Sequence, residues 1–249
     1  MIRIKEVYDF LCGKYPLDTA CNFDNPGFLV GDINGQTDSV LVSLDCDINT
    51  VKEAVKQNCK LIITHHPVIF NGLKSVTAGS VVYELIKNGV SVISMHTNLD
   101  IARGGVTERL CERLGLFDIT EFTANDGFLI RSAKSSIHNA DDFAVHAKNA
   151  LGGAVRYVSC GKEVKNVLVC SGSGGEFLSD AAKNGFDALV TADVKHNVFI
   201  DAVNAGISVF DCGHFASENV IIKPLADMLS AEFKDVSFLT YSPDYIKSI

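Results

Sequence analysis

The sequence predicts an α/β protein made of two similar halves, each with helices covering both faces of a mostly parallel or mixed sheet in a three-layer arrangement. Two observations support this class. Short runs rich in Val, Ile and Leu alternate with amphipathic helical stretches, which is typical of buried parallel strands linked by helices. The same order of strands and helices then returns in the second part of the 249-residue chain.

The first half opens with a helical pattern and continues through three apolar strands. The expected strands are SVLVSLD, KLIITHHP and VSVISMH, and each follows a polar loop or a helix. Helical spacing of apolar residues predicts helices over 4–12, 49–58 and 79–88, with a further helix after Gly104-Gly105. Asn88-Gly89 suits a left-handed residue that ends the third of these helices.

The second half repeats this order, which indicates an internal duplication. The strands NVLVCSG, DALVTAD and ISVFDCGH alternate with helices over FLSDAAKNG, 196–205 and 217–230. Without gaps, Val40-Leu41-Val42 aligns with Val167-Leu168-Val169 and Thr64 with Thr191, at one constant offset along the chain. Chance similarity of two βαβαβ segments is the rival explanation, because few residues are identical. We expect two domains, 1–122 and 123–249, with the C-terminal segment able to pack back on the first.

Composition excludes several classes of protein. The net charge of −8 and the lack of a Lys/Arg cluster argue against a nucleic-acid partner. Apolar runs fall short of the ~18 residues that span a bilayer, and the charged N-terminus does not resemble a signal peptide, so we expect no membrane partner and a cytoplasmic location. The 8 cysteines are scattered without a CxxC pair, which favours reduced thiols over disulfides or a thiolate metal site.

Potential metal ligands follow the strands of both halves. His65 and His66 come directly after the strand LIIT, and Asp100 ends the segment MHTNLD that leaves the next strand. In the second half His214 follows a strand, and Glu218 comes one helical turn later on the same face of the next helix. Because ligands collect at the carboxyl ends of strands, the two halves are expected to present these side chains to a shared cleft.

Five imidazole and carboxylate ligands exceed what one structural zinc needs and suit two divalent ions with a bridging carboxylate. Glu218 or Asp100 is the expected bridge. The mixed donor set favours Zn, Mn, Fe, Co or Ni over Mg or Ca. The alternatives are a chance histidine pair at 65 and 66, and a helix-dipole role for Glu218.

Other polar residues near the strand ends suggest supporting roles. His96 is expected to orient a ligand or contact substrate rather than bind metal. Asp193, which aligns with His66, and His196 could position substrate or cap the following helix. Asp24 and Asn25 could line the rim of the site, although such residues in turns often bond their own backbone. The run SGSGG at 171–175 suits either anion binding or a tight turn between strand and helix.

The motifs together identify a resemblance to the YbgI-like, "GTP cyclohydrolase 1 type 2" family, also called Nif-three-like dinuclear metal-centre proteins. They are Phe23-Asp24-Asn25, ITHHP, HTNLD followed by GG, SGSGG, TAD-x-KH and GHxxxE, in that order over about residues 5–235. The resemblance implies two interlinked α/β domains, two divalent metal ions per subunit and a toroidal homohexamer. By position it implies His65, His66, Asp100, His214 and Glu218 as ligands. Phe23 departs from the family, which usually has Trp there.

The resemblance and the residues favour a metal-dependent hydrolase of the GTP cyclohydrolase type 2 kind, using metal-bound hydroxide on a nucleotide or another small molecule. The same residues would serve a phosphatase or an amidohydrolase. A non-enzymatic metal-binding, metal-delivery or scaffold protein is the alternative from another class. Extra polar groups at Asp193, His196 and His96 favour chemistry over a purely structural role.

Overall fold

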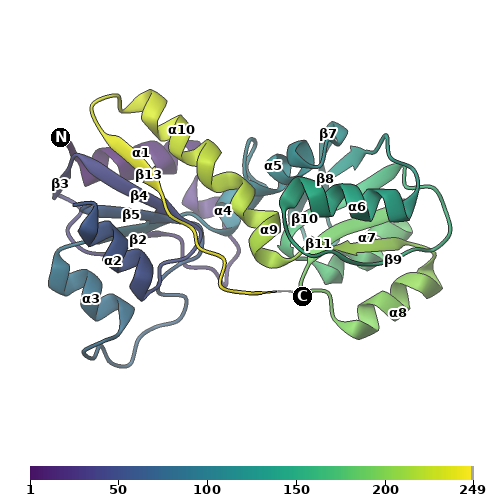
Figure 1. The fold of residues 1–249 in the computed structure, drawn as a ribbon, viewed down its shortest axis with the longest axis horizontal. Helices are drawn as coiled ribbons and strands as arrows, with labels where there is room; N and C mark the ends of the chain where they lie inside the picture. The colour runs from purple at the N-terminus through teal and green to yellow at the C-terminus, as the bar shows by residue number, and fades with distance from the viewer. Residues whose placement is uncertain (248–249) are drawn as a thin grey trace. The chain divides into compact units, whose positions relative to one another are not determined.

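A computed structural model gives the fold, and it describes residues 1–247 of the chain (Figure 1). The chain divides into two compact units. Unit 1 comprises Met1–Leu99 together with Ile222–Tyr245, and unit 2 comprises Asp100–Ile221. Both units are α/β, as the alternating pattern predicts.

Unit 1 is built on a five-stranded sheet in the order β13-β4-β5-β6-β2. Neighbouring strands run parallel except β2, which is antiparallel to β6. The strands are β2 (Gly27–Val30), β4 (Ser39–Ser43), β5 (Leu61–Thr64), β6 (Ser91–Ser94) and β13 (Ser237–Thr240), and a separate small ribbon pairs β1 (Ile2–Arg3) with β3 (Gln36–Thr37).

Helices cover both faces of this sheet. In Figure 1, α2 (Ile48–Lys56) and α3 (Val81–Asn88) lie on one face, and α1 (Ile4–Lys14) and α10 (Ile222–Glu232) lie on the other. Leu41, Ile62 and Val92 pack with Val51 and Leu85 in one core cluster. Every residue of β5 is buried, which explains why this strand reads as a continuous apolar run rather than an alternating one.

Unit 2 is built on a six-stranded sheet in the order β7-β8-β10-β11-β12-β9. The three central strands are parallel, and the outer ones are antiparallel to their neighbours. The strands are β7 (Phe117–Thr123), β8 (Leu129–Lys134), β9 (Arg156–Val158), β10 (Asn166–Ser173), β11 (Ala188–Ala192) and β12 (Ser208–Asp211).

This sheet also separates two cores. Val167 and Val169 face a cluster formed with α5 (Val106–Arg113) and α6 (Ala140–Leu151). Leu168 faces a second cluster formed with α7 (Leu178–Lys183) and α8 (His196–Ala205). The alternation along β10 thus buries both faces. The remaining helical turns are α4 (Thr97–Ile101), α9 (His214–Glu218), η1 (Leu17–Thr19), η2 (Gly175–Phe177) and η3 (Asn219–Ile221).

Strand register supports the internal duplication. Val40 pairs with Leu61 in unit 1, and Val167 pairs with Ala188 in unit 2. The residue numbers of the second pair exceed those of the first by one constant offset. The next pair of strands is also equivalent, because Leu61 pairs with Ser91 and Ala188 with Ser208. The three parallel strands therefore have the same order and register in both units.

The division between the units does not fall at the predicted boundary between residues 122 and 123, because that position lies inside β7 of unit 2. The division falls within α4, and the C-terminal segment rejoins unit 1 through β13, which pairs in parallel with β4. The repeat could not locate this boundary because β7, β8, α6 and β13 have no place in the shared βαβαβ order.

The helix predicted over 217–230 is also divided differently. It starts earlier, as α9 at His214, and a 3-10 turn at Asn219–Ile221 separates it from α10. Pro224 lies in the first turn of α10. Proline has no backbone N–H to donate to the preceding turn, so this position suits the start of a helix and not its interior.

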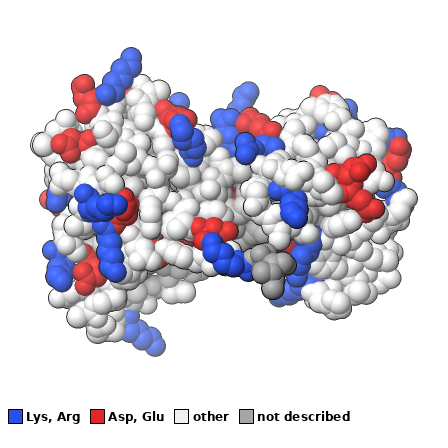
Figure 2. Space-filling view, in the orientation of Figure 1, with Lys and Arg blue, Asp and Glu red and all other residues white. Residues whose placement is uncertain are grey.

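The surface and the thiols complete this description. Lys and Arg side chains are intermixed with Asp and Glu on the face that Figure 2 shows. The 8 cysteines, all within residues 1–247, form no disulfide, and four of them are buried. Among residues 1–247, no helix has both the length and the apolar composition needed to cross a bilayer.

Candidate metal centre

Unit 1 places His65 and His66 side by side directly after β5. Their backbone N–H groups donate to the carbonyl oxygens of Ser43 and Leu44, at 3.2 and 3.0 Å, which continues the pairing with β4 past the end of the strand. The chain then bends before Pro67. The two imidazole rings are consequently neighbours, with centroids 4.9 Å apart, and do not point to opposite sides as they would on a straight strand.

His96 joins this pair from the end of β6. Its ring centroid lies 5.1 Å from that of His65 and 5.5 Å from that of His66. One nitrogen from each of the three rings falls in a group whose members all lie within 4.8 Å of one another. Sequence reasoning assigned His96 a supporting role, and the structure places it among the same group of donor atoms as the two predicted ligands.

Each of the three imidazoles is held through Nδ1. His65 Nδ1 donates to the carbonyl oxygen of Met95 at 2.9 Å. His66 Nδ1 donates to a carboxylate oxygen of Asp45 at 2.8 Å, and His96 Nδ1 donates to Asp24 at 2.7 Å. Carbonyl and carboxylate oxygens only accept, so they fix the proton on Nδ1. Nε2 is then the nitrogen that can coordinate a metal, as in carboxylate–histidine–metal arrangements.

The carboxylate of Asp24 is strongly held in its ionised form. Burial by itself would raise its pKa, but hydrogen bonds from His96 and Thr97 outweigh burial and bring the pKa of Asp24 to about 2. Both oxygens are used, one by His96 Nδ1 and the other by the backbone and hydroxyl of Thr97. Asp24 was expected at the rim of the site and acts as the partner of His96.

Asp45 is a partner that sequence reasoning did not single out. It follows β4 at the same sheet edge as His66, and its carboxylate holds the His66 ring. Its position directly after the apolar run SVLVSL was the available signal, since the other polar residues of the site also follow strands.

Unit 2 presents the predicted His214 and Glu218 on one short helix. His214 begins α9 and Glu218 ends it, so the two side chains share a face. His214 Nε2 lies 3.0 Å from a carboxylate oxygen of Glu218. The Glu218 side chain is almost fully buried, with 5% exposure, which is unusual for a carboxylate that only interacts with a helix dipole.

Asp193 holds the other side of the His214 ring. Its carboxylate accepts from Nδ1 at 2.7 Å. Asp193 has a left-handed backbone conformation, with φ of 51°, which non-glycine residues seldom adopt and Asp tolerates better than most. The four histidines that follow strand ends, His65, His66, His96 and His214, thus all have Nδ1 bound to an oxygen acceptor.

Asp100 is the third candidate ligand in unit 2. It is buried, with 8% exposure. The Ser171 hydroxyl donates to one of its oxygens at 2.9 Å, and the hydroxyl of Thr107 lies 2.8 Å from that of Ser171. Each hydroxyl has one proton to donate, so this arrangement orients a single carboxylate oxygen.

The glycine-rich run makes room for Glu218. A Cβ on Gly172 would lie only 2.2 Å from Glu218 Oε1, and Gly172 has φ of +60°. A Cβ on Gly174 would lie 2.7 Å from Thr191 Oγ1. The following helix, α7, is short. Of the two interpretations of SGSGG, the structure favours a tight turn that lets a carboxylate approach the backbone.

The remaining predicted residues have other contacts. Asn25 donates from Nδ2 to the carbonyl oxygen of Ile69 at 2.6 Å, so it ties two loops of unit 1 together. His196 is exposed at the first position of α8, where Lys195 is the N-cap residue, so His196 does not cap the helix. Burial raises the pKa of the Cys170 thiol well above its ordinary value, and the carboxylates of Asp100, Glu176 and Glu218 add to this. Cys170 is therefore a protonated core residue and not a thiolate ligand.

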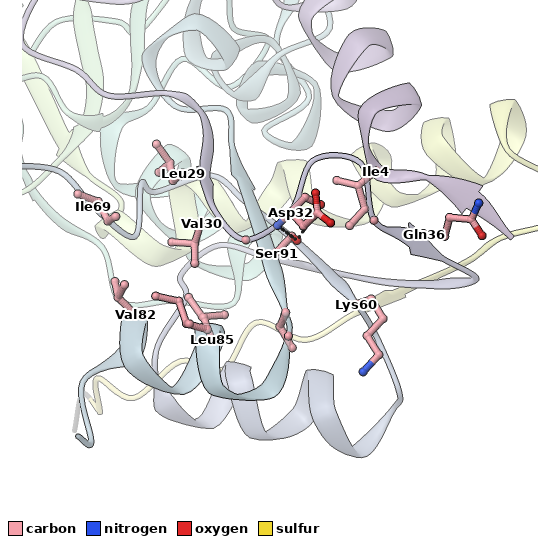
Figure 3. A pocket seen from close by; sticks show the side chains of 15 residues that line it. Ile4, Leu29, Val30, Asp32, Gln36, Lys60, Ile69, Val82, Leu85 and Ser91 are labelled. Atoms are coloured by element: carbon pink, nitrogen blue, oxygen red, sulfur yellow. Dashed lines mark hydrogen bonds between the residues drawn. The ribbon is translucent and has the colours of Figure 1, made fainter. Parts of the chain in front are cut away.

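A cavity of about 680 Å³ in unit 1 is distinct from the histidines (Figure 3). Leu29, Val30, Val82 and Leu85 form much of its apolar wall. Lys60 and Ser91 also line it, and they stand at the amino ends of β5 and β6. His65, His66 and His96 follow the carboxyl ends of the same strands. The cavity therefore reaches the amino ends of these strands, opposite the ends that the histidines follow.

Comparisons with known proteins agree with this fold. A "GTP cyclohydrolase 1 type 2 homolog" of Campylobacter jejuni is 35% identical over 230 residues, covering 90% of this chain and 91% of its own length. A protein of the same name from Clostridium perfringens is 30% identical over 255 residues, covering 96% of this chain and 95% of its own length. The crystal structure of a Staphylococcus aureus protein, SA1388, superposes with a TM-score of 0.91 at 25% identity, covering 100% of this chain and 99% of that one. Reduced HcgD from Methanocaldococcus jannaschii gives a TM-score of 0.83 at 26% identity, with coverage of 96% and 97%.

The family model described as Duf34/NIF3 (NGG1p interacting factor 3) matches residues 2–244, nearly the entire chain. The resemblance inferred from the motifs is thereby confirmed, and the chain belongs to the Duf34/NIF3 family.

Proposed function

We propose that this protein is a hydrolase that uses two divalent metal ions per chain, of the kind for which its relatives are named GTP cyclohydrolase 1 type 2 homologues. The proposed ligands are His65, His66, Asp100, His214 and Glu218. The observation that carries the proposal is the fixed tautomer of the histidines: His65, His66 and His214 each donate from Nδ1 to an oxygen acceptor. Histidines with no ligand to bind do not need this common arrangement.

The donor set fits such ions. Imidazole nitrogens and carboxylate oxygens together suit Zn, Mn, Fe, Co or Ni better than Mg or Ca. In unit 1 the rings of the proposed ligands His65 and His66 are already neighbours, with centroids 4.9 Å apart, without rearrangement of the chain. In unit 2 the carboxylates of Glu218 and of the hydroxyl-oriented Asp100 are buried, which suits groups whose charge a cation neutralises.

Bound ions of this type supply Lewis-acid polarisation of the substrate and lower the pKa of water to about 7. The protein's own residues complete the chemistry. Asp24 keeps the Nδ1 proton of His96 in place, so His96 Nε2 can accept a proton or a hydrogen bond from the reacting group. Asp45 and Asp193 orient His66 and His214 in the same manner. We further propose that the protein works in the cytoplasm as a homohexamer on a small-molecule substrate.

The first test is metal content. Protein reconstituted with Zn, Mn, Fe, Co or Ni should contain about two ions per chain by elemental analysis, and His65→Ala or Glu218→Ala should lower this to one or zero. His138→Ala is a suitable control, since His138 is exposed and contacts Glu163. An unchanged ratio in Glu218→Ala would exclude Glu218 as a ligand.

The second test concerns turnover of nucleotides, phosphoesters and amides. His96→Ala should retain both ions but lose about 10²-fold or more in rate, the usual loss for an acid–base or orienting group. Loss of an ion in His96→Ala would make it a ligand. Two bound ions with no turnover of any substrate would favour the alternative, a metal-delivery or scaffold protein.

A further inference from the structure

Two exposed phenylalanines lie beside the histidine cluster of unit 1. Phe23 is 67% exposed and Phe70 is 44% exposed, although such side chains are usually buried. Their ring centroids are 6.3 Å apart, with planes tilted by 45°. They come from two loops that four strands and a helix, from β2 to β5, separate along the chain, so local sequence does not account for their meeting.

Both loops are held in place next to the rings. Asn25, which closely follows Phe23, donates to the carbonyl oxygen of Ile69, the residue before Phe70. Asp24, directly after Phe23, has a carboxylate with no side-chain exposure that binds His96 and Thr97. The two rings are thus presented to solvent by an ordered backbone, which lowers the entropy loss when a ligand covers them.

The rings continue into the candidate metal site. The Phe70 ring meets the His96 ring edge to face, with centroids 6.2 Å apart and planes at 79°. His96 in turn contacts His65 and His66 at 5.1 and 5.5 Å between centroids. A flat group that covers Phe23 and Phe70 therefore brings its substituents next to the three histidines.

We propose that Phe23 and Phe70 form a stacking site for a planar heteroaromatic ring, such as a nucleobase, of the small-molecule substrate. The proposal rests on the proposed hydrolase function, because it uses the same histidines. Phenyl rings offer a π-face and no hydrogen-bonding group, so they select a flat aromatic ligand without distinguishing one base from another. Hydrolysis of a ring bond or of a group attached to the ring then takes place on the histidine side of the stack.

A second copy of the chain is the competing occupant. Leu73 and Val76, on the same loop as Phe70, are 50% and 45% exposed, and a protein surface would cover them as well. We favour the aromatic ligand because the two rings, and not these aliphatic residues, are the ones in contact with each other and with His96. Leu73 therefore provides a matched control.

The chain has no tryptophan, so Phe23→Trp introduces a single tryptophan at the proposed site, whose fluorescence can be excited selectively over that of the 6 tyrosines. GTP and guanosine should quench this fluorescence in the metal-loaded protein, whereas tripolyphosphate and ribose 5-phosphate should not. In the Phe23→Trp background, Phe70→Ala and Phe70→Leu should weaken binding roughly 5- to 100-fold. Phe70→Tyr should bind as tightly as the parent, and Leu73→Ala should have no effect.

Several outcomes would overturn the proposal. Ring stacking would be contradicted if tripolyphosphate quenched as strongly as GTP, or if no ring compound quenched the fluorescence. It would also be contradicted if Phe70→Leu and Leu73→Ala had equal effects on binding. A smaller oligomer by light scattering in Phe23→Ala/Phe70→Ala, without ring-dependent quenching, would assign the surface to subunit contact. Elemental analysis of the same samples separates the two proposals: two ions per chain without quenching defeats only the stacking site, and absence of bound metal defeats the hydrolase function.

Discussion

The guanidinium of Arg131 donates a hydrogen bond of 2.8 Å to the carbonyl oxygen of Ile101, the residue directly after Asp100. The same nitrogen donates to Ala102 at 2.9 Å, and Nε lies 3.5 Å from a carboxylate oxygen of Glu108. Arg131 is 1% exposed, among the largest fully buried side chains of the described residues. It therefore secures the segment of unit 2 that carries a candidate metal ligand.

Replacement of Arg131 by Met should lower the free energy of unfolding of the metal-free protein by about 2–3 kcal/mol, because the change leaves two half-buried carbonyl groups and a half-buried carboxylate without their donor. Urea denaturation measures the effect. Arg109→Met is the control, because the Arg109–Glu112 pair is 38% and 45% exposed and should contribute less than about 1 kcal/mol. Equal losses in the two variants would show that burial of Arg131 is irrelevant to its role.

Gly172→Ala should displace the Glu218 carboxylate and weaken metal binding by at least about 10-fold. The added Cβ would lie 2.2 Å from Glu218 Oε1, so the carboxylate must move. Gly89→Ala is a matched control, since Gly89 has φ of +62° against +60° for Gly172 and no atom lies within 4 Å of its added Cβ. Both variants should lose stability through backbone strain. Chelator competition should detect weaker metal binding only in Gly172→Ala, and the same affinity in both would exclude the steric explanation.

Asp193→Asn should weaken metal binding by about 10- to 100-fold while preserving the fold. Asn tolerates the left-handed backbone at this position, but it lacks the charge that stabilises the His214 Nδ1 proton. Asp118 has the same φ of 51° and pairs with Lys134 at the surface. Asp118→Asn should therefore leave the affinity measured by metal titration unchanged. If the two substitutions act alike, the contact with His214 has no influence on the metal.

Much of this arrangement could be predicted from the sequence, because strand ends and helical spacing are local properties. His65, His66, His214 and Glu218 were located by such patterns, and the alignment of Asp193 with His66 also indicated a position at a strand end. Partners such as Asp45 and Ser171 could not be identified, since their contacts depend on which strands become neighbours in the sheet. The order of β7, β8 and β13 depends in the same way on long-range pairing, which periodicity does not encode.

Asp47→Asn should destabilise the protein near pH 7, and the difference from wild type should shrink in acid. Asp47 caps α2 by accepting from the backbone N–H of Thr50 at 2.7 Å. Burial raises the pKa of Asp47, but hydrogen bonds with Thr50 and Tyr245 outweigh burial and hold this pKa below its ordinary value of 3.8. A lowered pKa in the folded state means that the stabilisation is present above pH ~4 and is lost as the pH falls through the folded-state pKa.

The magnitude and the control for this helix cap are straightforward. Asp47→Ala should lose about 1 kcal/mol at pH 7, the usual value for an N-cap, and Asp47→Asn should lose less because Asn also caps. Urea denaturation between pH 7 and pH 3 provides the measurement. Asp9→Asn, in the exposed pair with Lys5, is the control and should lose less than about 1 kcal/mol at pH 7. If the difference in unfolding free energy between wild type and Asp47→Asn grew in acid, the lowered pKa of Asp47 in the folded state would be contradicted.

Strand β13 pairs with β4 although the whole of unit 2 lies between them in the sequence, whereas the strands of unit 2 all lie between Phe117 and Asp211. Unit 2 can complete its sheet from one continuous segment of the chain. Unit 1 must wait for β13, with the outer edge of β4 open until then. The histidine cluster of unit 1 is therefore assembled late, and a chain truncated before Ser237 should expose this edge and aggregate rather than fold.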